Sequence, residues 1–302
     1  MNRSWIPAPL LLVALSFGSL WNFSPESGAV ASDFEPEMRE HAPVIAPRVP
    51  ADLQLFGEQV PLADFGIAES LDQELVVNTY RHSSTILYIK RASRWFPVIE
   101  PILEAEGVPD DFKYLAVIES GLSQAVSPAG ASGFWQFMKG TAPEFGLEIS
   151  STVDERYHVE KATRAACQYL KDAHERFGSW VLAAASYNMG MAGVAGALED
   201  QGVSSYWDLY LNEETSRYIF RLLALREVMG KPDQYGFFLS DQDMYGPWET
   251  REVVVGQTID DLAAFSLKQS TTLKTLKSLN PWLRTDRLDA SQGKAYTLKI
   301  PA

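Results

Sequence analysis

The sequence predicts a mainly α-helical protein with a small C-terminal unit of mixed α and β structure. Apolar residues recur at helical spacing through most of residues 66–240. Residues 250–302 change to a strand-helix-helix-strand pattern, which begins with Val253–Val255 and closes with Tyr296–Ile300. A chain of 302 residues with 46% hydrophobic content can bury the core of one medium domain and one smaller domain.

The composition excludes several classes of function. The formal net charge is −13, so the acidic surface repels phosphate backbones and nucleic acid is not an expected partner. The histidines and the single cysteine lack the spacing of metal ligands, and the chain has no P-loop or dinucleotide fingerprint, so neither a metal nor a cofactor is expected. Cys167 lies among alanines in a helical pattern and is predicted to be a small core residue.

The N-terminal part predicts export. Arg3 precedes an apolar run over residues 10–21, which is shorter than the ~20 residues that span a bilayer. Residues 1–23 therefore favour a signal peptide, with an uncleaved membrane anchor as the alternative, and the expected location is the periplasm or cell envelope. Residues 24–65 are rich in proline, alanine, serine and acidic residues, which predicts a flexible linker, with ordered structure beginning near residue 66.

Two helical stretches follow the linker. Ile67, Leu71 and Leu75 begin the apolar face of the first helical stretch. The second helical stretch ends at Gly107. Pro101 is expected to kink or break the second helix. Five large side chains here either border a ligand cleft or, as the favoured interpretation, pack against the rest of the domain: Tyr80, Arg81, Tyr88, Arg91 and Trp95.

The central stretch, residues 112–138, carries the strongest chemical signal. Glu119 directly follows a buried helical run, and Ser120 and Gly121 mark the end of that helix. The negative end of the helix dipole and apolar walls both disfavour ionisation, so the pKa of Glu119 should be raised. A carboxyl group prepared in this way can act as a general acid near neutral pH.

The residues after Glu119 suit a cleft for a sugar chain. Residues 127–133 are small and include two glycines, so the backbone can turn tightly and approach a ligand. Phe134, Trp135 and Phe137 then supply aromatic faces, and Gln136 is the one strong hydrogen-bonding side chain among them.

Three further helices are expected after this stretch. Apolar residues trace one face of a long helix from Val159 to Phe177. Ser179 is predicted to cap a second helix that ends with Tyr187 and Asn188. A third helix begins near Glu214. Asp154 and Arg156, which precede the first of these helices, are interpreted as structural ion-pair partners.

Four of these segments resemble, in the same order, the motifs of lytic transglycosylases with a goose-lysozyme-like (SLT-type) catalytic domain: Glu119–Ser120, Ser127–Gly133, Gly133–Met138 and Ser186–Asn188. The resemblance implies a lysozyme-like helical catalytic domain, placed over residues 66–240 with a helical extension at its start. Gly190–Val194 departs from the family's usual second glycine and basic residue. The resemblance further implies that Glu119 is catalytic and that substrate is bound by Ser127, Gln136, Met138, Tyr187, Asn188, Glu214 and Tyr218.

The C-terminal unit, residues 250–302, resembles a LysM glycan-binding module. The resemblance rests on Gly256–Ile259, Asn280–Pro281 and Ile300–Pro301, although Gln257 replaces the more usual acidic residue. A module that only supports the enzyme structurally is the alternative.

Together these resemblances imply that peptidoglycan glycan strands are the partner. The implied reaction cleaves the β-1,4 bond between N-acetylmuramic acid and N-acetylglucosamine and leaves a 1,6-anhydromuramic acid end. Three alternatives stay open at this point: a hydrolytic muramidase, a non-catalytic peptidoglycan-binding protein and a chitinase-like enzyme.

Overall fold

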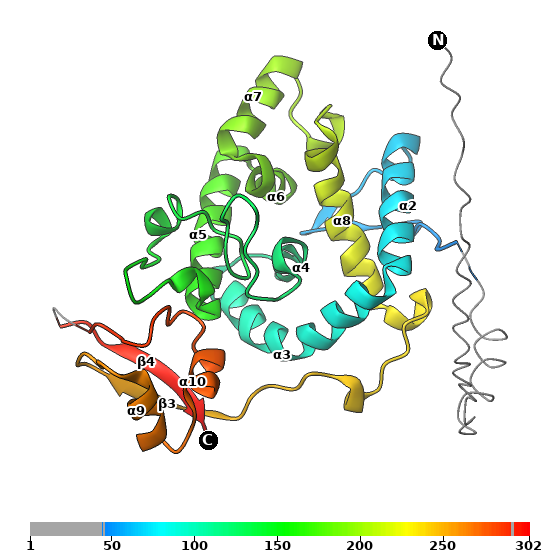
Figure 1. The fold of residues 1–302 in the computed structure, drawn as a ribbon. Helices are drawn as coiled ribbons and strands as arrows, with labels where there is room; N and C mark the ends of the chain where they lie inside the picture. Colours follow the sequence, from blue (N-terminus) through cyan, green and yellow to red (C-terminus); the bar gives the residue numbers. More distant parts are fainter. Residues whose placement is uncertain (1–43, 45, 291–292) are drawn as a thin grey trace, which may run out of the picture. The chain divides into compact units, whose positions relative to one another are not determined.

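The computed structural model describes residue 44, residues 46–290 and residues 293–302. The predicted signal peptide or anchor and half of the predicted linker lie outside the described residues. Residues 46–302 form one compact unit, and its helices confirm the mainly α-helical fold class (Figure 1). The long helices of the first part are α2 (Phe65–Tyr80), α3 (His82–Glu106), α4 (Lys113–Ser120), α5 (Val159–Phe177), α6 (Trp180–Met189), α7 (Met191–Gln201) and α8 (Glu213–Gly230).

A small hairpin precedes these helices and corrects the linker prediction. Strand β1 (Gln54–Leu55) pairs antiparallel with β2 (Glu58–Gln59), and Leu55 is fully buried in the main core. Phe56 stacks on Phe112 with ring centroids 4.0 Å apart. The prediction of a flexible linker up to residue 65 is therefore wrong for this segment, because its few apolar residues bury against helices that come much later in the chain.

Helix α3 runs without a break through both of its prolines. Pro97 and Pro101 lie inside the helix, and Figure 1 shows α3 as a curved helix along one side of the domain. Of the two outcomes expected at Pro101, a kink or a break, the break is absent. Since each proline removes one backbone donor, a bend is the ordinary accommodation. The helix ends at Gly107, as predicted, with a positive φ of 69°.

The main core lies between the helices of the first part. Helices α5, α6 and α8 contribute buried aliphatic side chains, and the alanine-rich α6 is almost wholly enclosed. Cys167 of α5 is fully buried, which confirms its interpretation as a core residue, and burial raises the pKa of its thiol to about 12. Ser179 caps α6 through a hydrogen bond from the Leu182 amide, also as predicted.

The C-terminal unit has the predicted order of strand, two helices and strand. Strand β3 (Thr250–Val255) pairs antiparallel with β4 (Tyr296–Pro301), and the register places Thr250 opposite Pro301. Helices α9 (Leu262–Lys268) and α10 (Leu273–Leu279) lie between the strands in sequence. Leu262, Leu276 and Leu298 form the centre of its own small core.

This small core also takes side chains from the first part of the chain. Val153 is fully buried there and forms an isolated antiparallel bridge with Leu283. The Asp154 amide donates to the Trp282 carbonyl at 2.9 Å, and the Arg284 amide donates to the Thr152 carbonyl at 2.9 Å. The C-terminal unit is therefore joined to residues 152–154 by backbone hydrogen bonds, and we call this contact the seam.

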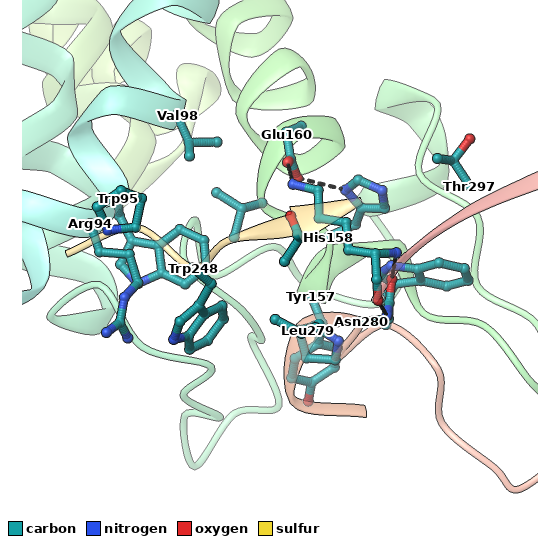
Figure 2. A pocket seen from close by; sticks show the side chains of 16 residues that line it. Arg94, Trp95, Val98, Tyr157, His158, Glu160, Trp248, Leu279, Asn280 and Thr297 are labelled. Carbon is teal, nitrogen blue, oxygen red and sulfur yellow. Dashed lines mark hydrogen bonds and ion pairs between the residues drawn. The ribbon is translucent and has the colours of Figure 1, made fainter. Parts of the chain in front are cut away.

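A cavity of about 110 Å³ lies beside the seam (Figure 2). Its walls include Trp95 and Trp248, and Glu160 of α5 faces it together with Lys299 of β4 and His158. Burial opposes ionisation of Glu160, but its contacts with His158 and Lys299 prevail and lower its pKa to about 2. The cavity is smaller than the roughly 300 Å³ of typical ligand pockets, and these charged groups already pair with one another. It is therefore best described as a packing gap between the two parts.

Among the described residues, no single helix is both long and apolar enough to cross a membrane. The pair α6 and α7 passes that criterion together, with a bend of 113° between its members, although α6 is buried in the core.

Candidate active site

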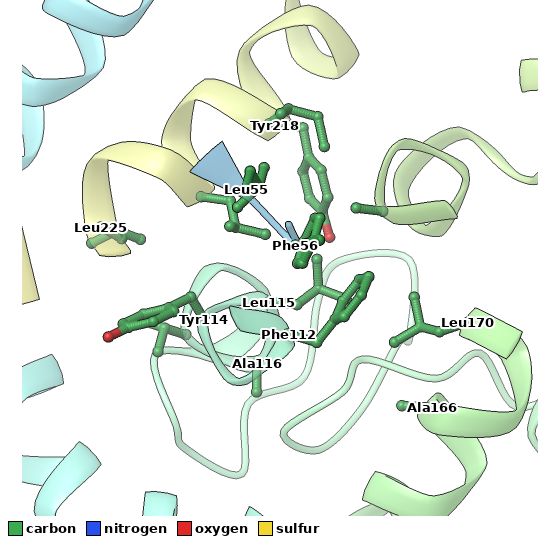
Figure 3. Packing of buried hydrophobic residues seen from close by; sticks show 14 of the residues in the cluster. Leu55, Phe56, Phe112, Tyr114, Leu115, Ala116, Ala166, Leu170, Tyr218 and Leu225 are labelled. Atoms are coloured by element: carbon green, nitrogen blue, oxygen red, sulfur yellow. The ribbon is translucent and has the colours of Figure 1, made fainter. Parts of the chain in front are cut away.

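The helix that carries Glu119 is packed on several sides. Figure 3 shows Leu115 and Ala116 of α4 among side chains of α5, α8 and the hairpin, including Leu170, Leu225 and Leu55. This packing fixes the position of the helix end. Helix α4 stops at Ser120, and Gly121 takes a left-handed conformation with φ 59°, as its position after the apolar run predicted.

Helix α3 holds that helix end from outside. The Arg91 guanidinium donates to the Gly121 carbonyl at 2.9 Å. A methyl group added at Gly121 would lie 2.6 Å from the Tyr88 ring, so the close contact requires glycine. Trp95 packs edge-on against Phe134 with ring centroids 5.0 Å apart. For these three α3 residues, the packing interpretation is confirmed.

Glu119 is partly buried, and its carboxylate accepts a hydrogen bond from the hydroxyl of Tyr218 on α8. Burial raises the pKa of Glu119 to about 7, although the Tyr218 hydrogen bond and the positive charge of Arg221 work against the rise. The negative charge of Glu214 also raises the pKa of Glu119. The direction agrees with the sequence prediction, and removal from water is the largest cause.

Tyr187 and Tyr218 bring two other helices to Glu119. Tyr187, near the end of α6, donates its hydroxyl to the Trp135 carbonyl at 2.7 Å, which ties α6 to the central loop. Burial, and then the charge of Glu119, raise the pKa of Tyr187 well above its ordinary value. Tyr218 is only 3% exposed, and burial, followed by Glu119, also raises its pKa. Both phenols therefore stay protonated and can donate hydrogen bonds.

Asn188 and Glu214 lie where α6 ends and α8 begins. The Asn188 side-chain oxygen accepts a hydrogen bond from the Thr215 hydroxyl at 2.9 Å, which links the two helices. Glu214 is exposed in the first turn of α8, yet it is close enough for its charge to act on Glu119. The structure thus brings Glu119, Tyr187, Glu214 and Tyr218 together.

Ser127, Gln136 and Met138 belong to the loop after α4, and two of them shape that loop. The Ser127 hydroxyl accepts from the Ala131 amide at 3.0 Å. The Gln136 amide donates to the carbonyls of Ala125 and Gly133 at 3.1 and 2.7 Å. Met138, in contrast, is 44% exposed and free to meet a ligand. Contact of these residues with substrate stays a prediction.

Arg156 fixes the same loop from the seam side. It forms the predicted ion pair with Asp154 at 2.7 Å and donates to the carbonyls of Gly130 and Phe137. Gly133 approaches so closely that an added Cβ would lie 1.9 Å from the Arg156 carbonyl oxygen. Glycine at this position, with φ 79°, allows the loop to lie against the seam.

Sequence reasoning missed the buried carboxylate between α2 and α8. Glu74 of α2 has a side chain only 2% exposed, and Arg217 binds it at 2.7 Å. Arg221 lies 3.9 Å from the other carboxylate oxygen. The sequence signal for this pair was an acidic residue between Leu71 and Leu75, on the buried apolar face of a helix. A carboxylate at such a position requires a cationic partner.

Two family models match parts of the chain. Residues 97–209 match the family model of the transglycosylase SLT domain, and this range contains Glu119 and the central loop. Residues 251–302 match the C-terminal LysM-like domain of soluble lytic transglycosylases. The chain is therefore similar to an SLT-type transglycosylase domain in its first part and to a LysM-like domain in its last part.

The chain is similar in sequence to membrane-bound lytic murein transglycosylase D of Escherichia coli. It is 28% identical to the proteins of strains K12 and O6:H1 over 247 residues, which cover 77% of this chain and 51% of each relative. The chain thus spans about half the length of these curated relatives. Among solved structures, an inactive mutant of lytic transglycosylase Slt from Pseudomonas aeruginosa aligns with a TM-score of 0.36 and 22% identity, over 50% of this chain and 26% of that one.

Proposed function

We propose that this protein is a lytic transglycosylase that cleaves the β-1,4 bond between N-acetylmuramic acid and N-acetylglucosamine in peptidoglycan, with formation of 1,6-anhydromuramic acid ends. The observation that carries the proposal is Glu119, a carboxyl group with a pKa of about 7 that receives a hydrogen bond from Tyr218. The match of the surrounding residues to the SLT domain supports the same reaction class.

In the first step, protonated Glu119 donates its proton to the glycosidic oxygen while the bond from that oxygen to the muramic C1 breaks. With a pKa of about 7, a substantial fraction of Glu119 carries this proton near neutrality. The carboxylate that remains keeps the Tyr218 hydrogen bond, which is stronger to a charged acceptor than to a neutral one.

In the second step, the Glu119 carboxylate takes the proton of the muramic C6 hydroxyl, and the C6 oxygen bonds to C1. Glu119 is thereby protonated again and the anhydro ring is closed. Because the nucleophile belongs to the substrate, no second carboxylate is needed, and proximity lowers the barrier.

The remaining site residues are assigned to substrate binding. Met138 and Glu214 are exposed and suited to direct contact with the glycan. Ser127, Gln136, Tyr187 and Asn188 already hold loop and helix ends through their hydrogen bonds. Part of their contribution to binding is therefore to keep the loop in one conformation.

A hydrolytic muramidase is the second candidate, because Glu214 is a further carboxylate close enough to influence Glu119. Hydrolysing enzymes use a second carboxylate to activate water or to act as nucleophile. Mass analysis of the products from purified peptidoglycan separates the two reactions. Anhydromuramic ends support the proposal, whereas reducing ends with one added water contradict it and favour the hydrolase.

Two other outcomes of the same digestion would also reject the proposal. Binding to sacculi with no released fragments would indicate a non-catalytic wall-binding protein. Equal or faster cleavage of peptide-free N-acetylglucosamine chains would indicate a chitinase-like enzyme. Glu119→Gln is the matched control, since general acid catalysis is commonly worth 10²–10⁴-fold and its loss should raise the barrier by about 3 kcal/mol or more.

A location in the cell envelope is part of the proposal, as is contact with peptidoglycan. The predicted signal peptide or anchor over residues 1–23 would export the chain, and an uncleaved anchor would add membrane association. N-terminal sequencing of protein from fractionated cells tests this. A start after residue 23 in the soluble envelope fraction supports cleavage, and an intact start in the membrane fraction supports the anchor.

A further inference from the structure

The segment that connects α8 to the C-terminal part is bound along α3. The Tyr245 amide donates to the Lys90 carbonyl at 3.3 Å, and the Arg94 guanidinium donates to the Gly246 carbonyl at 2.9 Å. Figure 1 shows this segment passing α3 on its way from α8 to β3. We call residues 245–248 the strap, since hydrogen bonds from two backbone positions hold it to the helix.

The strap ends in an aromatic side chain that two α3 side chains hold. The Arg94 guanidinium lies over the Trp248 ring, 4.4 Å from its centroid, and the Trp95 ring packs edge-on against it with centroids 5.6 Å apart. Figure 2 shows these three side chains together at one end of the cavity. Trp248 is still 43% exposed, so its contacts with α3, rather than enclosure in a core, fix its position.

Trp95 contacts the strap and the active-site loop at once. Besides Trp248, its ring packs edge-on against Phe134 with centroids 5.0 Å apart. Phe134 is only 2% exposed and belongs to the central loop, residues 121–138, which follows α4. Arg91, four residues before Trp95 on the same face of α3, donates to the first carbonyl of that loop at 2.9 Å. A single ring therefore connects the strap to the central loop.

The neighbours of Phe134 in the chain carry contacts of the proposed site. On one side, the Trp135 carbonyl accepts the hydrogen bond of the Tyr187 hydroxyl at 2.7 Å. On the other side, the Gly133 carbonyl accepts from the Gln136 amide at 2.7 Å. A movement of the Phe134 ring therefore displaces backbone groups to which two of the proposed substrate-binding residues are bonded.

We propose that Trp248 is a positioning residue of the active site, which holds Trp95 against Phe134 and so keeps the central loop in the conformation that receives the glycan beside Glu119. This inference rests on the proposed function, because its kinetic consequence requires that the central loop meets substrate. It gives the strap a task in the reaction that is separate from any binding of glycan by the C-terminal part. A displacement of about 1 Å far from the chemistry can slow a reaction about 10²-fold, so a change at Trp248 is measurable.

The first test observes the central loop without turnover. Phenylalanine is replaced by 4-fluorophenylalanine, and the ¹⁹F signal of Phe134 is identified as the one lost in Phe134→Leu. Trp248→Ala should shift and broaden that signal, and Trp248→Tyr should restore most of it, because an aromatic ring again meets Trp95. The control is Phe238→Ala, which removes an 82% exposed ring from the same connecting segment and should leave the Phe134 signal unchanged.

The second test compares kcat and KM on short soluble glycans and on long peptidoglycan strands, at a temperature where circular dichroism shows every variant to be folded. Trp248→Ala should lower kcat roughly tenfold on both substrates, within the range that small displacements produce. Trp248→Tyr should recover most of the loss, and Phe238→Ala should match the wild type.

A second variant keeps the proposal testable if Trp248→Ala does not fold. Arg94→Gln leaves the three rings in place but removes the contacts with Gly246 and with the Trp248 ring. It should change the Phe134 signal and kcat in the same directions by smaller factors, and it then decides the question by the same two readouts.

Three results would overturn the proposal. The first is an unchanged Phe134 signal in the folded variants of Trp248 and Arg94. The second is an equal change of that signal in Phe238→Ala. The third is a raised KM on long strands with an unchanged kcat, because the exposed Trp248 ring would then bind glycan directly.

The ¹⁹F signal separates this inference from the proposed function. If digestion yields reducing ends while the Phe134 signal still moves in Trp248→Ala and not in Phe238→Ala, the transglycosylase reaction fails but the control of the loop by Trp248 stands. If anhydro ends form and the signal does not move, the reaction stands and the role of Trp248 fails.

Discussion

At the scale of single residues, burial and the side chains of α8 have opposing effects on the ionisation of the Glu119 carboxyl group. Burial raises its pKa, while Tyr218 and Arg221 lower it. The position of Glu119 could be predicted because it depends on local sequence, an apolar run followed by Ser120 and Gly121. The effect of Arg221 could not be predicted, because it depends on how α8 crosses α2 and α4, which no local pattern records.

The raised pKa of Glu119 predicts a cost in stability at alkaline pH. Because the pKa in the folded state is about 7 against 4.5 for the free group, the wild-type protein loses stability as pH rises from 4.5 through 7. The loss is up to about 3 kcal/mol, because the pKa differs by about 2.5 between the folded and unfolded states. Glu119→Gln should therefore be more stable than wild type at pH 8 and closely similar at pH 4.5, as measured by urea unfolding. An equal gain at both pH values would contradict this explanation.

Two glycines of the central loop provide a matched pair of substitutions. Both have positive φ, but a Cβ at Gly130 would meet open space, whereas a Cβ at Gly133 would meet the Arg156 carbonyl at 1.9 Å. Gly130→Ala should cost about 1 kcal/mol from the backbone conformation alone. Gly133→Ala should cost about 3 kcal/mol or more, since the loop must also move. Thermal unfolding and cleavage rates test this, and similar losses for both variants would contradict it.

At the scale of secondary-structure elements, the β1–β2 hairpin works as an external cap for α6. Glu58 accepts hydrogen bonds from the amides of Trp180 and Val181 at 2.5 and 3.2 Å and from the Ser179 hydroxyl at 2.8 Å. The long helices could be predicted from apolar periodicity and glycine stops. The hairpin could not, because two-residue strands have no period, and the residues that bury them lie more than 50 positions away in the chain.

Removal of the Glu58 side chain should weaken α6. Glu58→Ala leaves helix amides without an acceptor, which should lower the free energy of unfolding by about 2 kcal/mol. The neighbouring Gln59→Ala, at an exposed position, should change it by less than about 0.5 kcal/mol. Because α6 ends with Tyr187 and Asn188, the Glu58 variant should also lose activity at temperatures well below its unfolding midpoint. Equal stability of the two variants, by chemical denaturation, would show that the cap is dispensable.

At the scale of the whole described unit, the seam fixes the position of the C-terminal part against the first part. The two parts share buried side chains, backbone hydrogen bonds and the Lys299–Glu160 ion pair. The sequence predicted both parts separately, because each has its own pattern. It left open whether the second part is fixed to the first, since the contacting residues 152–154 show no motif.

The ion pair between Lys299 and Glu160, beside the seam, predicts that stability depends on pH in the acid range. Glu160 has a folded pKa of about 2 against 4.5 for the free group, so its contribution to stability is present above pH 4.5 and is lost as pH falls toward 2. Lys299→Met should lower stability at pH 7 by about 1–2 kcal/mol, a value reduced for partial exposure, and should match wild type more closely near pH 2. Lys277→Met, which breaks an exposed pair with Asp286, should have little effect. A constant deficit of Lys299→Met at every pH would refute the assignment.

The seam also has a mechanical consequence. The Trp282 carbonyl in the C-terminal part accepts a hydrogen bond from the Asp154 amide. The Asp154 side chain in turn forms an ion pair with Arg156. Arg156 in turn holds the carbonyls of Gly130 and Phe137. A displacement of the C-terminal part is therefore transmitted, through Asp154 and Arg156, to the loop that follows Glu119.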